Sequence, residues 1–301
     1  MKNNFDILKT QIATSIRNRR YQKKQALMKS AVPSKKHPLV ICSTTHTPGS
    51  SEVSKQSEGL NSKKDVVEAE AALKKCSSSD ESLHVKQLLR ETYSVRRLWI
   101  EKDATNIKEI IEKCPQLNIH SLIMQEFCQI KDKNEALLYN SMDKLILKLG
   151  SYFEINIFDE TSKVEILLTV HEKLTLGKYR KVNESIIIIE EAGKSTKALL
   201  TSDSTAPRLV LYSAEGSIAE AFIVSAGARV KIQEPSVSRA VVCLFATYYV
   251  WHCNYPTAYC NLLEYFDFEI TGKITKNNRI LKFIRDMQFK NKKNNKPSEQ
   301  K

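Results

Sequence analysis

Glycine is scarce in this chain, at 8 of 301 residues, which is under half of the average usage of about 7%. Loops that wrap tightly around a phosphate or a cofactor generally need glycine, because glycine adopts positive φ without strain. Neither the Gly-x-Gly-x-x-Gly pattern of dinucleotide-binding folds nor the Gly-x-Ser-x-Gly elbow of hydrolases occurs. The scarcity and the missing motifs predict a protein that is not an enzyme and binds no cofactor.

Metal-site spacings are missing as well. The cysteines are odd in number, and no pair has the two-residue spacing of a zinc knuckle. Most stand beside apolar residues, so we expect reduced, buried thiols in an intracellular protein and no metal centre. They are Cys42, Cys76, Cys114, Cys128, Cys243, Cys253 and Cys260.

Long hydrophobic runs are also absent. No stretch reaches the roughly 18 apolar residues of a membrane span, and the first residues contain no apolar segment of signal-peptide length. We therefore expect neither a membrane partner nor secretion. The most apolar stretch, Ala240–Trp251, has 12 residues and is interrupted only by Thr247. Its length favours a central helix within a packed core.

Two short patterns suggest catalysis, and both are incomplete. The segment Ala192–Thr196 (AGKST) follows an expected strand, yet a phosphate-binding loop needs a glycine where Ile188 stands. A turn is therefore expected there. His252, Cys253 and Cys260 lie close in sequence, but no orienting acid and no fourth metal ligand accompany them. We expect a structural role for these three residues.

Charge is unevenly distributed along the chain, whose formal net charge is +13. Residues 1–80 hold 15 Lys or Arg against 7 Asp or Glu, and residues 271–301 hold 10 against 2, so each end carries +8. Residues 81–270 hold 22 Lys or Arg against 25 Asp or Glu and carry a net charge of −3. The excess cations at the ends favour contacts with the phosphates of nucleic acid or with another polyanion.

Two basic arms are the candidate nucleic-acid-binding segments. The predicted contact residues are Arg17, Arg19, Arg20, Lys23 and Lys24 in the first arm and Lys290, Lys292, Lys293 and Lys296 in the second. A short amphipathic helix over residues 5–16 is expected to precede the first cluster. This arm allows three interpretations: a solvated tail, a nuclear-import or nucleic-acid patch, and a mitochondrial transit peptide. We expect a nuclear protein, with the cytoplasm and then the mitochondrion as alternatives.

The order of the patterns predicts an α+β fold in which a helical cluster is followed by a small sheet covered by a central apolar helix, between disordered basic termini. Residues 1–82 are expected to form a basic, largely disordered arm and linker, with a transient helix over Val66–Leu73. A helical subdomain over 83–180, an α/β subdomain over 181–289 and a basic disordered tail over 290–301 are expected to follow.

Periodicity predicts the elements within these subdomains. Helices are expected over residues 83–100, 107–114, 119–130, 135–152, 163–174, 236–253, 257–268 and 280–289. The branched run Ile186–Ile189 predicts a strand buried on both faces, and Leu209–Tyr212 a second strand. Ala221–Val224 and Ala228–Ile232 flank Gly227, a pattern typical of a hairpin.

An ordered set of short motifs resembles a known family. The motifs are LLRETY at 88–93, RRLWI at 96–100, residues 107–115, EF at 126–127, APRLVL at 206–211, the apolar helix at 240–251 and NYP at 254–256. Over roughly residues 83–289 they resemble the C-terminal region of sterile alpha motif domain-containing protein 3-like proteins. The resemblance implies a shared fold and a mobile-element lineage, and it brings no catalytic residues. Residues 1–80 resemble neither a sterile alpha motif nor a ubiquitin-like module, so a self-association or adaptor role is not implied.

These observations together predict a non-enzymatic intracellular interaction protein whose basic arms contact nucleic acid. The alternative is a protein–protein interaction module whose tails only confer solubility. An unrecognised enzyme is the third possibility.

Overall fold

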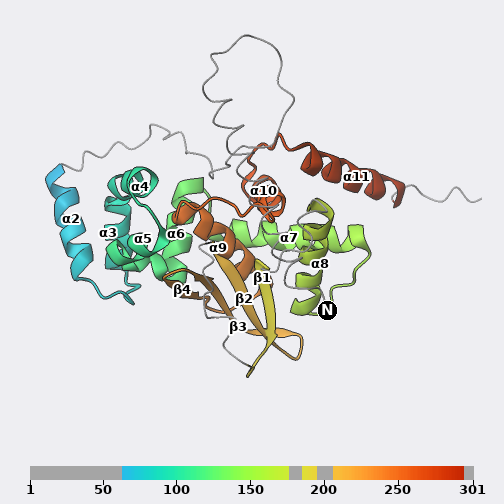
Figure 1. The fold of residues 1–301 in the computed structure, drawn as a ribbon, viewed down its shortest axis with the longest axis horizontal. Coiled ribbons are helices and arrows are strands. Elements are labelled where there is room, and N and C mark those ends of the chain that lie inside the picture. The colour runs from blue at the N-terminus through green and yellow to red at the C-terminus, as the bar shows by residue number, and fades with distance from the viewer. Residues whose placement is uncertain (1–62, 176–184, 195–205, 295–301) are drawn as a thin grey trace, which may run out of the picture. The chain divides into compact units, whose positions relative to one another are not determined.

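The helices and strands follow one another as expected of an α+β protein (Figure 1). The computed structural model describes residues 63–175, 185–194 and 206–294, so the predicted arm and linker before residue 63 lie outside it. Its first helices are α2 (Lys63–Lys75), α3 (Leu83–Glu91), α4 (Tyr93–Lys102), α5 (Ile107–Lys113), the 3₁₀ turn η1 (Pro115–Asn118), α6 (His120–Lys131), α7 (Glu135–Phe153) and α8 (Glu160–Leu174). The strands β1 (Ile187–Glu191), β2 (Arg208–Ala214), β3 (Ser217–Ser225) and β4 (Ala228–Lys231) follow, and then α9 (Val237–Val250), α10 (Cys260–Phe266), the π-helical turn η4 (Asp267–Thr271) and α11 (Asn278–Asn294).

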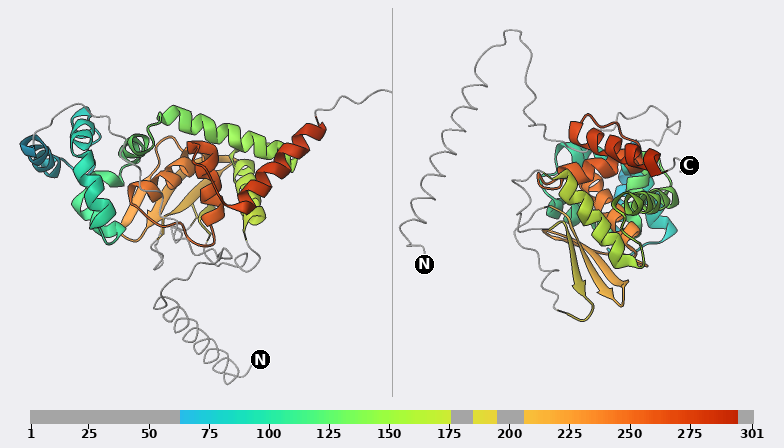
Figure 2. Two further views of the ribbon diagram at one scale, coloured as in Figure 1. Left: turned by 90° about the horizontal axis from the view of Figure 1, so that it is seen from above. Right: turned by 90° about the vertical axis from the view of Figure 1, so that its right-hand side faces the viewer.

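Four strands form one sheet in the order β1-β2-β3-β4. β1 pairs with β2 in parallel, whereas β2–β3 and β3–β4 are antiparallel pairs. The turn between β3 and β4 contains Gly227, whose φ of +81° suits glycine. The predicted hairpin is confirmed. Figure 2 shows, in its right-hand view, the helices gathered on one side of this sheet.

The expectation that β1 is buried on both faces is wrong. β1 is an edge strand of the sheet, and although Ile187 is buried, Ile189 is 39% exposed. β-branched side chains favour the extended conformation whether a strand has one neighbour or two. The run of isoleucines therefore identifies a strand but not its position in the sheet.

Helix α9 lies at the centre of the molecule, as its apolar sequence predicts (Figure 1). Every residue of α9 except Arg239 is buried, and the helix packs against α6, α7 and α8 and against β2 and β3. The hydroxyl groups of its tyrosines are hydrogen-bonded. The Tyr248 hydroxyl donates to the Pro207 carbonyl oxygen (2.7 Å), and Nε1 of Trp251, just after the helix, donates to the Leu117 carbonyl oxygen (3.0 Å). The aromatic residues thus fill the core and also tether the start of β2 and η1.

One hydrophobic core joins the helical and the α/β halves. Its buried side chains extend from Ile100 to Met287. Phe127 of α6 meets Phe245 of α9 edge to face, with ring centroids 5.6 Å apart and an interplanar angle of 88°. The boundary expected at residue 180 therefore does not separate two cores, and the described residues all fall within one compact unit.

The body begins earlier than expected, at α2. Ala69 and Leu73 are buried in a small cluster with Leu88 and Leu89 of α3. The side chain of Gln116 donates to the Leu73 carbonyl oxygen (3.2 Å). α2 is therefore a docked helix of the body, where the sequence predicts only a transient one within a linker.

Candidate nucleic-acid interface

The structure describes one of the nine predicted contact residues in full, Lys290. Lys292 and Lys293 belong to the last turn of α11, but their side chains are outside the described part of the chain. Arg17, Arg19, Arg20, Lys23, Lys24 and Lys296 lie outside it altogether. Nucleic-acid binding by the first arm therefore stays a prediction.

Lys290 is part of the folded body and not of a disordered tail. Its Nζ lies 2.6 Å from Oε1 of Glu154, just after α7, and donates to the Tyr152 carbonyl oxygen (2.9 Å). The hydrogen bond and the charge of Lys290 lower the pKa of the Glu154 carboxyl. Residues 290–294, expected in a disordered tail, belong to α11, and Lys290 forms an ion pair with an acid of the body.

Helix α11 is anchored by an apolar face. Ile280, Phe283, Ile284 and Met287 recur at helical spacing and are all buried. Phe283 lies edge-on to Tyr152, with ring centroids 5.6 Å apart, and belongs to the main core. Figure 2 shows α11 alongside the end of α7. Helix α11 up to Lys290 thus has a fixed orientation on the protein surface.

The outward side of this region carries four cations that the sequence analysis did not single out. Lys276, Arg279, Lys282 and Arg285 follow one another at intervals of three residues. Lys276, Lys282 and Arg285 are exposed and Arg279 is half-buried, and none has an ion-pair partner among the described residues. Asp286 is the one acid within α11. The signal available in the sequence was the interleaving of these cations with the apolar residues of an amphipathic helix.

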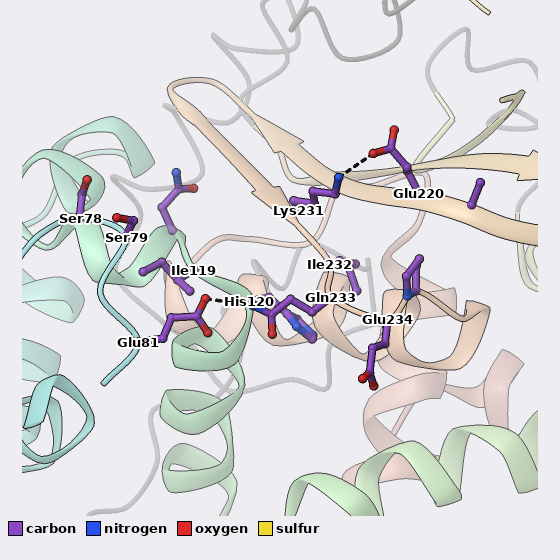
Figure 3. A pocket seen from close by; sticks show the side chains of 13 residues that line it. Ser78, Ser79, Glu81, Ile119, His120, Glu220, Lys231, Ile232, Gln233 and Glu234 are labelled. Atoms are coloured by element: carbon purple, nitrogen blue, oxygen red, sulfur yellow. Dashed lines mark hydrogen bonds and ion pairs between the residues drawn. The ribbon is translucent and has the colours of Figure 1, made fainter. Parts of the chain in front are cut away.

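A polar hollow of about 510 Å³ lies among the α2–α3 loop, the start of α6 and the residues around the end of β4 (Figure 3). Figure 3 shows its charged groups engaged with neighbours: Gln233 donates to Oε1 of Glu81 (2.9 Å), and Nζ of Lys231 lies 2.6 Å from Oε1 of Glu220. Burial lowers the pKa of His120, which favours the neutral ring. Nε2 of His120 lies 3.5 Å from the hydroxyl of Tyr139, which donates to Oε1 of Glu135 (2.7 Å). Burial raises the pKa of this hydroxyl, so it is not an activated nucleophile.

The two incomplete catalytic patterns also form no site within the described residues. Gly193 and Lys194 form a turn after β1, as predicted, and Lys194 pairs with Glu191, while Ser195 and Thr196 lie outside the described residues. Burial raises the pKa of the Cys253 thiol to about 12. This thiol stays protonated at neutral pH, which agrees with the structural role expected for it.

A second cluster of charged groups surrounds Asp267 in the π-helical turn η4. Nζ of Lys131 lies 3.3 Å from Oδ1 of Asp267 and 3.6 Å from the ring centroid of Tyr249, whose hydroxyl also donates to Asp267. Nζ of Lys273 lies 3.2 Å from Oδ2 of Asp267. Burial lowers the pKa of Lys131 to about 8. We interpret the cluster as an anchor that joins α6, α9 and η4, since its groups are engaged with one another.

The described ranges contain no group of three or more His, Cys, Asp or Glu side chains placed to hold a metal ion. No helix within them is long and apolar enough to cross a membrane. No protein-family model matches the chain, no curated protein matches it, and no solved structure matches its fold.

Proposed function

We propose that this is a non-enzymatic interaction protein whose C-terminal helix α11 presents a fixed row of cations to nucleic acid or another polyanion. The observation that carries the proposal is the two-sided character of α11. Its apolar face is buried in the core, while Lys282 and Arg285 are exposed. A cation held on a docked helix contacts a phosphate with less loss of conformational entropy than one on a free tail.

The proposed contact residues differ in part from those expected from sequence. Arg279, Lys282 and Arg285 take the place of Lys290, which Glu154 neutralises. Lys292, Lys293 and Lys296 extend the same basic segment, and the cluster from Arg17 to Lys24 is a second arm in this proposal. Such contacts are independent of base sequence and weaken steeply with salt.

The test is binding of the full chain to a fluorescent DNA duplex and to RNA over a range of salt concentrations. The variant replaces Arg279, Lys282 and Arg285 with Gln. A matched control replaces Lys102, Lys133 and Lys144 with Gln, because these lysines are exposed, like Lys282 and Arg285, and have no ion-pair partner among the described residues. Both variants lose three positive charges.

We expect the α11 variant to bind the duplex about tenfold more weakly at low salt and to lower the salt slope by about 2–3, since each phosphate contact contributes about 0.9 to that slope. The control should change affinity less than twofold. Equal losses in both variants would show that only total charge matters, which contradicts a localised interface. Replacement of Arg17, Arg19, Arg20, Lys23 and Lys24 with Gln measures the contribution of the first arm.

The proposal includes a nuclear location, for which the basic cluster after residue 16 is the basis. Imaging of the tagged chain with and without residues 1–36 tests it. Loss of nuclear signal on deletion supports the location, and an unchanged cytoplasmic or mitochondrial signal contradicts it.

A further inference from the structure

The outer edge of β1 carries backbone hydrogen-bonding groups without a strand partner in the described part of the chain. Leu209 N donates to the Ile186 carbonyl oxygen (2.7 Å), and Ala192 N donates to the Ser213 carbonyl oxygen (2.8 Å). In a parallel pair, alternate residues direct their backbone groups to the partner strand. Residues 186, 188, 190 and 192 therefore face β2, and the N–H and C=O groups of Ile189 face outward.

Helix α8 forms the opposite wall of a groove along this edge. The groove has a volume of about 510 Å³ and is lined by α8 together with Ser185, Ile189 and Tyr259. Leu168 of α8 and Ile189 of β1 are 37% and 39% exposed, so an apolar contact is available on each wall. In Figure 1, β1 is the strand at the α8 end of the sheet. An open strand edge beside a helix is the arrangement that accepts an extended peptide as an additional strand.

The charges of the groove favour one kind of occupant. Glu165 and Glu172 line it from α8, and neither has an ion-pair partner among the described residues. No lysine or arginine belongs to the lining. On the strand itself Glu191 already pairs with Lys194, so the unpaired acids of the groove are Glu165 and Glu172.

We propose that the groove between β1 and α8 binds an extended basic segment of a partner protein by strand addition. The partner's backbone pairs with Ile189, its apolar side chains contact Leu168 and Ile189, and its lysines or arginines contact Glu165 and Glu172. This inference is independent of the polyanion interface on α11, since it needs a cationic ligand and involves other elements.

The probe is the fluorescent peptide (Lys-Val)4, with (Glu-Val)4 as its counterpart, titrated with the full chain. We expect the lysine peptide to bind at least tenfold more tightly than the glutamate peptide. The double substitution Glu165→Lys with Glu172→Lys should reverse this preference. A matched control, Glu68→Lys with Asp103→Lys, makes the same charge change at exposed acids outside the groove and outside α11, and it should keep the preference. Equal binding of both peptides to the unmodified chain would overturn the proposal.

The backbone contact has its own test. Ile189→Pro removes an N–H that faces away from β2, so the β1–β2 pairing keeps its hydrogen bonds while the peptide loses one. We expect at least fivefold weaker peptide binding for this variant and unchanged binding for Ile189→Val. Hydrogen exchange in the unmodified chain gives a second measurement that does not depend on the variant's folding.

Saturation with (Lys-Val)4 should slow exchange of the Ile189 amide and leave that of Ile188, which already faces β2, unchanged. An unaltered Ile189 amide at saturation would exclude strand addition. A concentration-dependent dimer that Ile189→Pro abolishes would assign the edge to self-association instead.

Discussion

Arg96 and Glu126 form an ion pair in the protein interior, with Nη2 of the guanidinium 2.5 Å from Oε2 of the carboxylate and side chains only 3% and 2% exposed. Nη1 of Arg96 donates to Oγ1 of Thr92 (2.5 Å), and Nη2 also donates to the Leu89 carbonyl oxygen (2.9 Å). The pair joins α4 to α6 across 30 residues of sequence. Arg96 is therefore a structural element of the core.

We predict that Arg96→Met lowers the free energy of unfolding by about 3–5 kcal/mol, because it leaves the Glu126 carboxylate buried without its partner. The double variant Arg96→Met with Glu126→Leu should be considerably more stable than the single variant, since no charge is then buried. Urea unfolding measures both. Single losses that simply add in the double variant would show that the two side chains are not coupled.

Lys131 gives the protein a predictable dependence on pH. Its folded pKa of about 8 lies below the value of 10.5 expected of an unfolded lysine. Between these values the unfolded state binds more protons than the folded state, so this residue's contribution to stability rises with pH by up to about 1.4 kcal/mol per unit. Below pH 8 the buried positive charge of Lys131 opposes folding. Above pH 10.5 the contribution of Lys131 to stability no longer changes with pH.

The measurement is the difference in unfolding free energy between the unmodified chain and Lys131→Met from pH 7.5 to 9.5. The difference should shift in favour of the unmodified chain as pH rises. Subtraction removes the opposing effect of groups away from Lys131 such as Tyr93, whose pKa is raised by burial and which therefore lowers stability once unfolded tyrosines ionise. A flat difference across this range would contradict the lowered pKa of Lys131.

Gly216 makes a close contact with the start of α8. Its φ is +79°, and a Cβ atom there would lie 2.6 Å from Oδ2 of Asp159. Oδ1 of Asp159 caps α8 by accepting a hydrogen bond from the backbone N–H of Ser162 (2.8 Å), and Glu160 N donates to the Gly216 carbonyl oxygen (2.9 Å). We predict that Gly216→Ala costs about 2–4 kcal/mol, from backbone strain together with loss of the cap.

Gly193→Ala is the matched control for this substitution. Gly193 has nearly the same φ, +82°, but a Cβ there meets no atom within 4 Å. It should therefore show the backbone strain alone, about 1–2 kcal/mol. Thermal unfolding of both variants measures the difference, and equal losses would mean that the contact with Asp159 contributes nothing.

Elements with strong local signals were predictable from the sequence. The apolar stretch Ala240–Trp251 identified the central helix, and Gly227 between two branched runs identified the hairpin.

The expected helix over 83–100 is instead two helices, α3 and α4, which meet at Thr92. Oγ1 of Thr92 donates to the Leu88 carbonyl oxygen (2.8 Å) and accepts from Arg96. That network requires Glu126 and could not be deduced from local periodicity.

Nucleic-acid binding by the basic segments stays a prediction, and the structure shows only how the described cations are placed. The charge asymmetry indicated the C-terminal basic segment, in which Lys282 and Arg285 are exposed. It did not reveal that Lys290 is held by Glu154, because that contact crosses 136 positions of the sequence. That β1 lies at the edge of the sheet could not be predicted from the sequence either, because strand order depends on pairing between residues far apart in the chain.

The central position of α9 also determines the order in which the protein can be assembled on the ribosome. Helices α6 and α7 are synthesised well before residues 237–250, the segment against which both pack. Until then Phe127 and its neighbours lack their eventual contact surface, so the nascent chain has to be held by chaperones or remain loosely collapsed. We expect a chain that ends between α8 and α9 to aggregate, because it exposes the apolar faces of α6 and α7 that α9 covers in the complete fold.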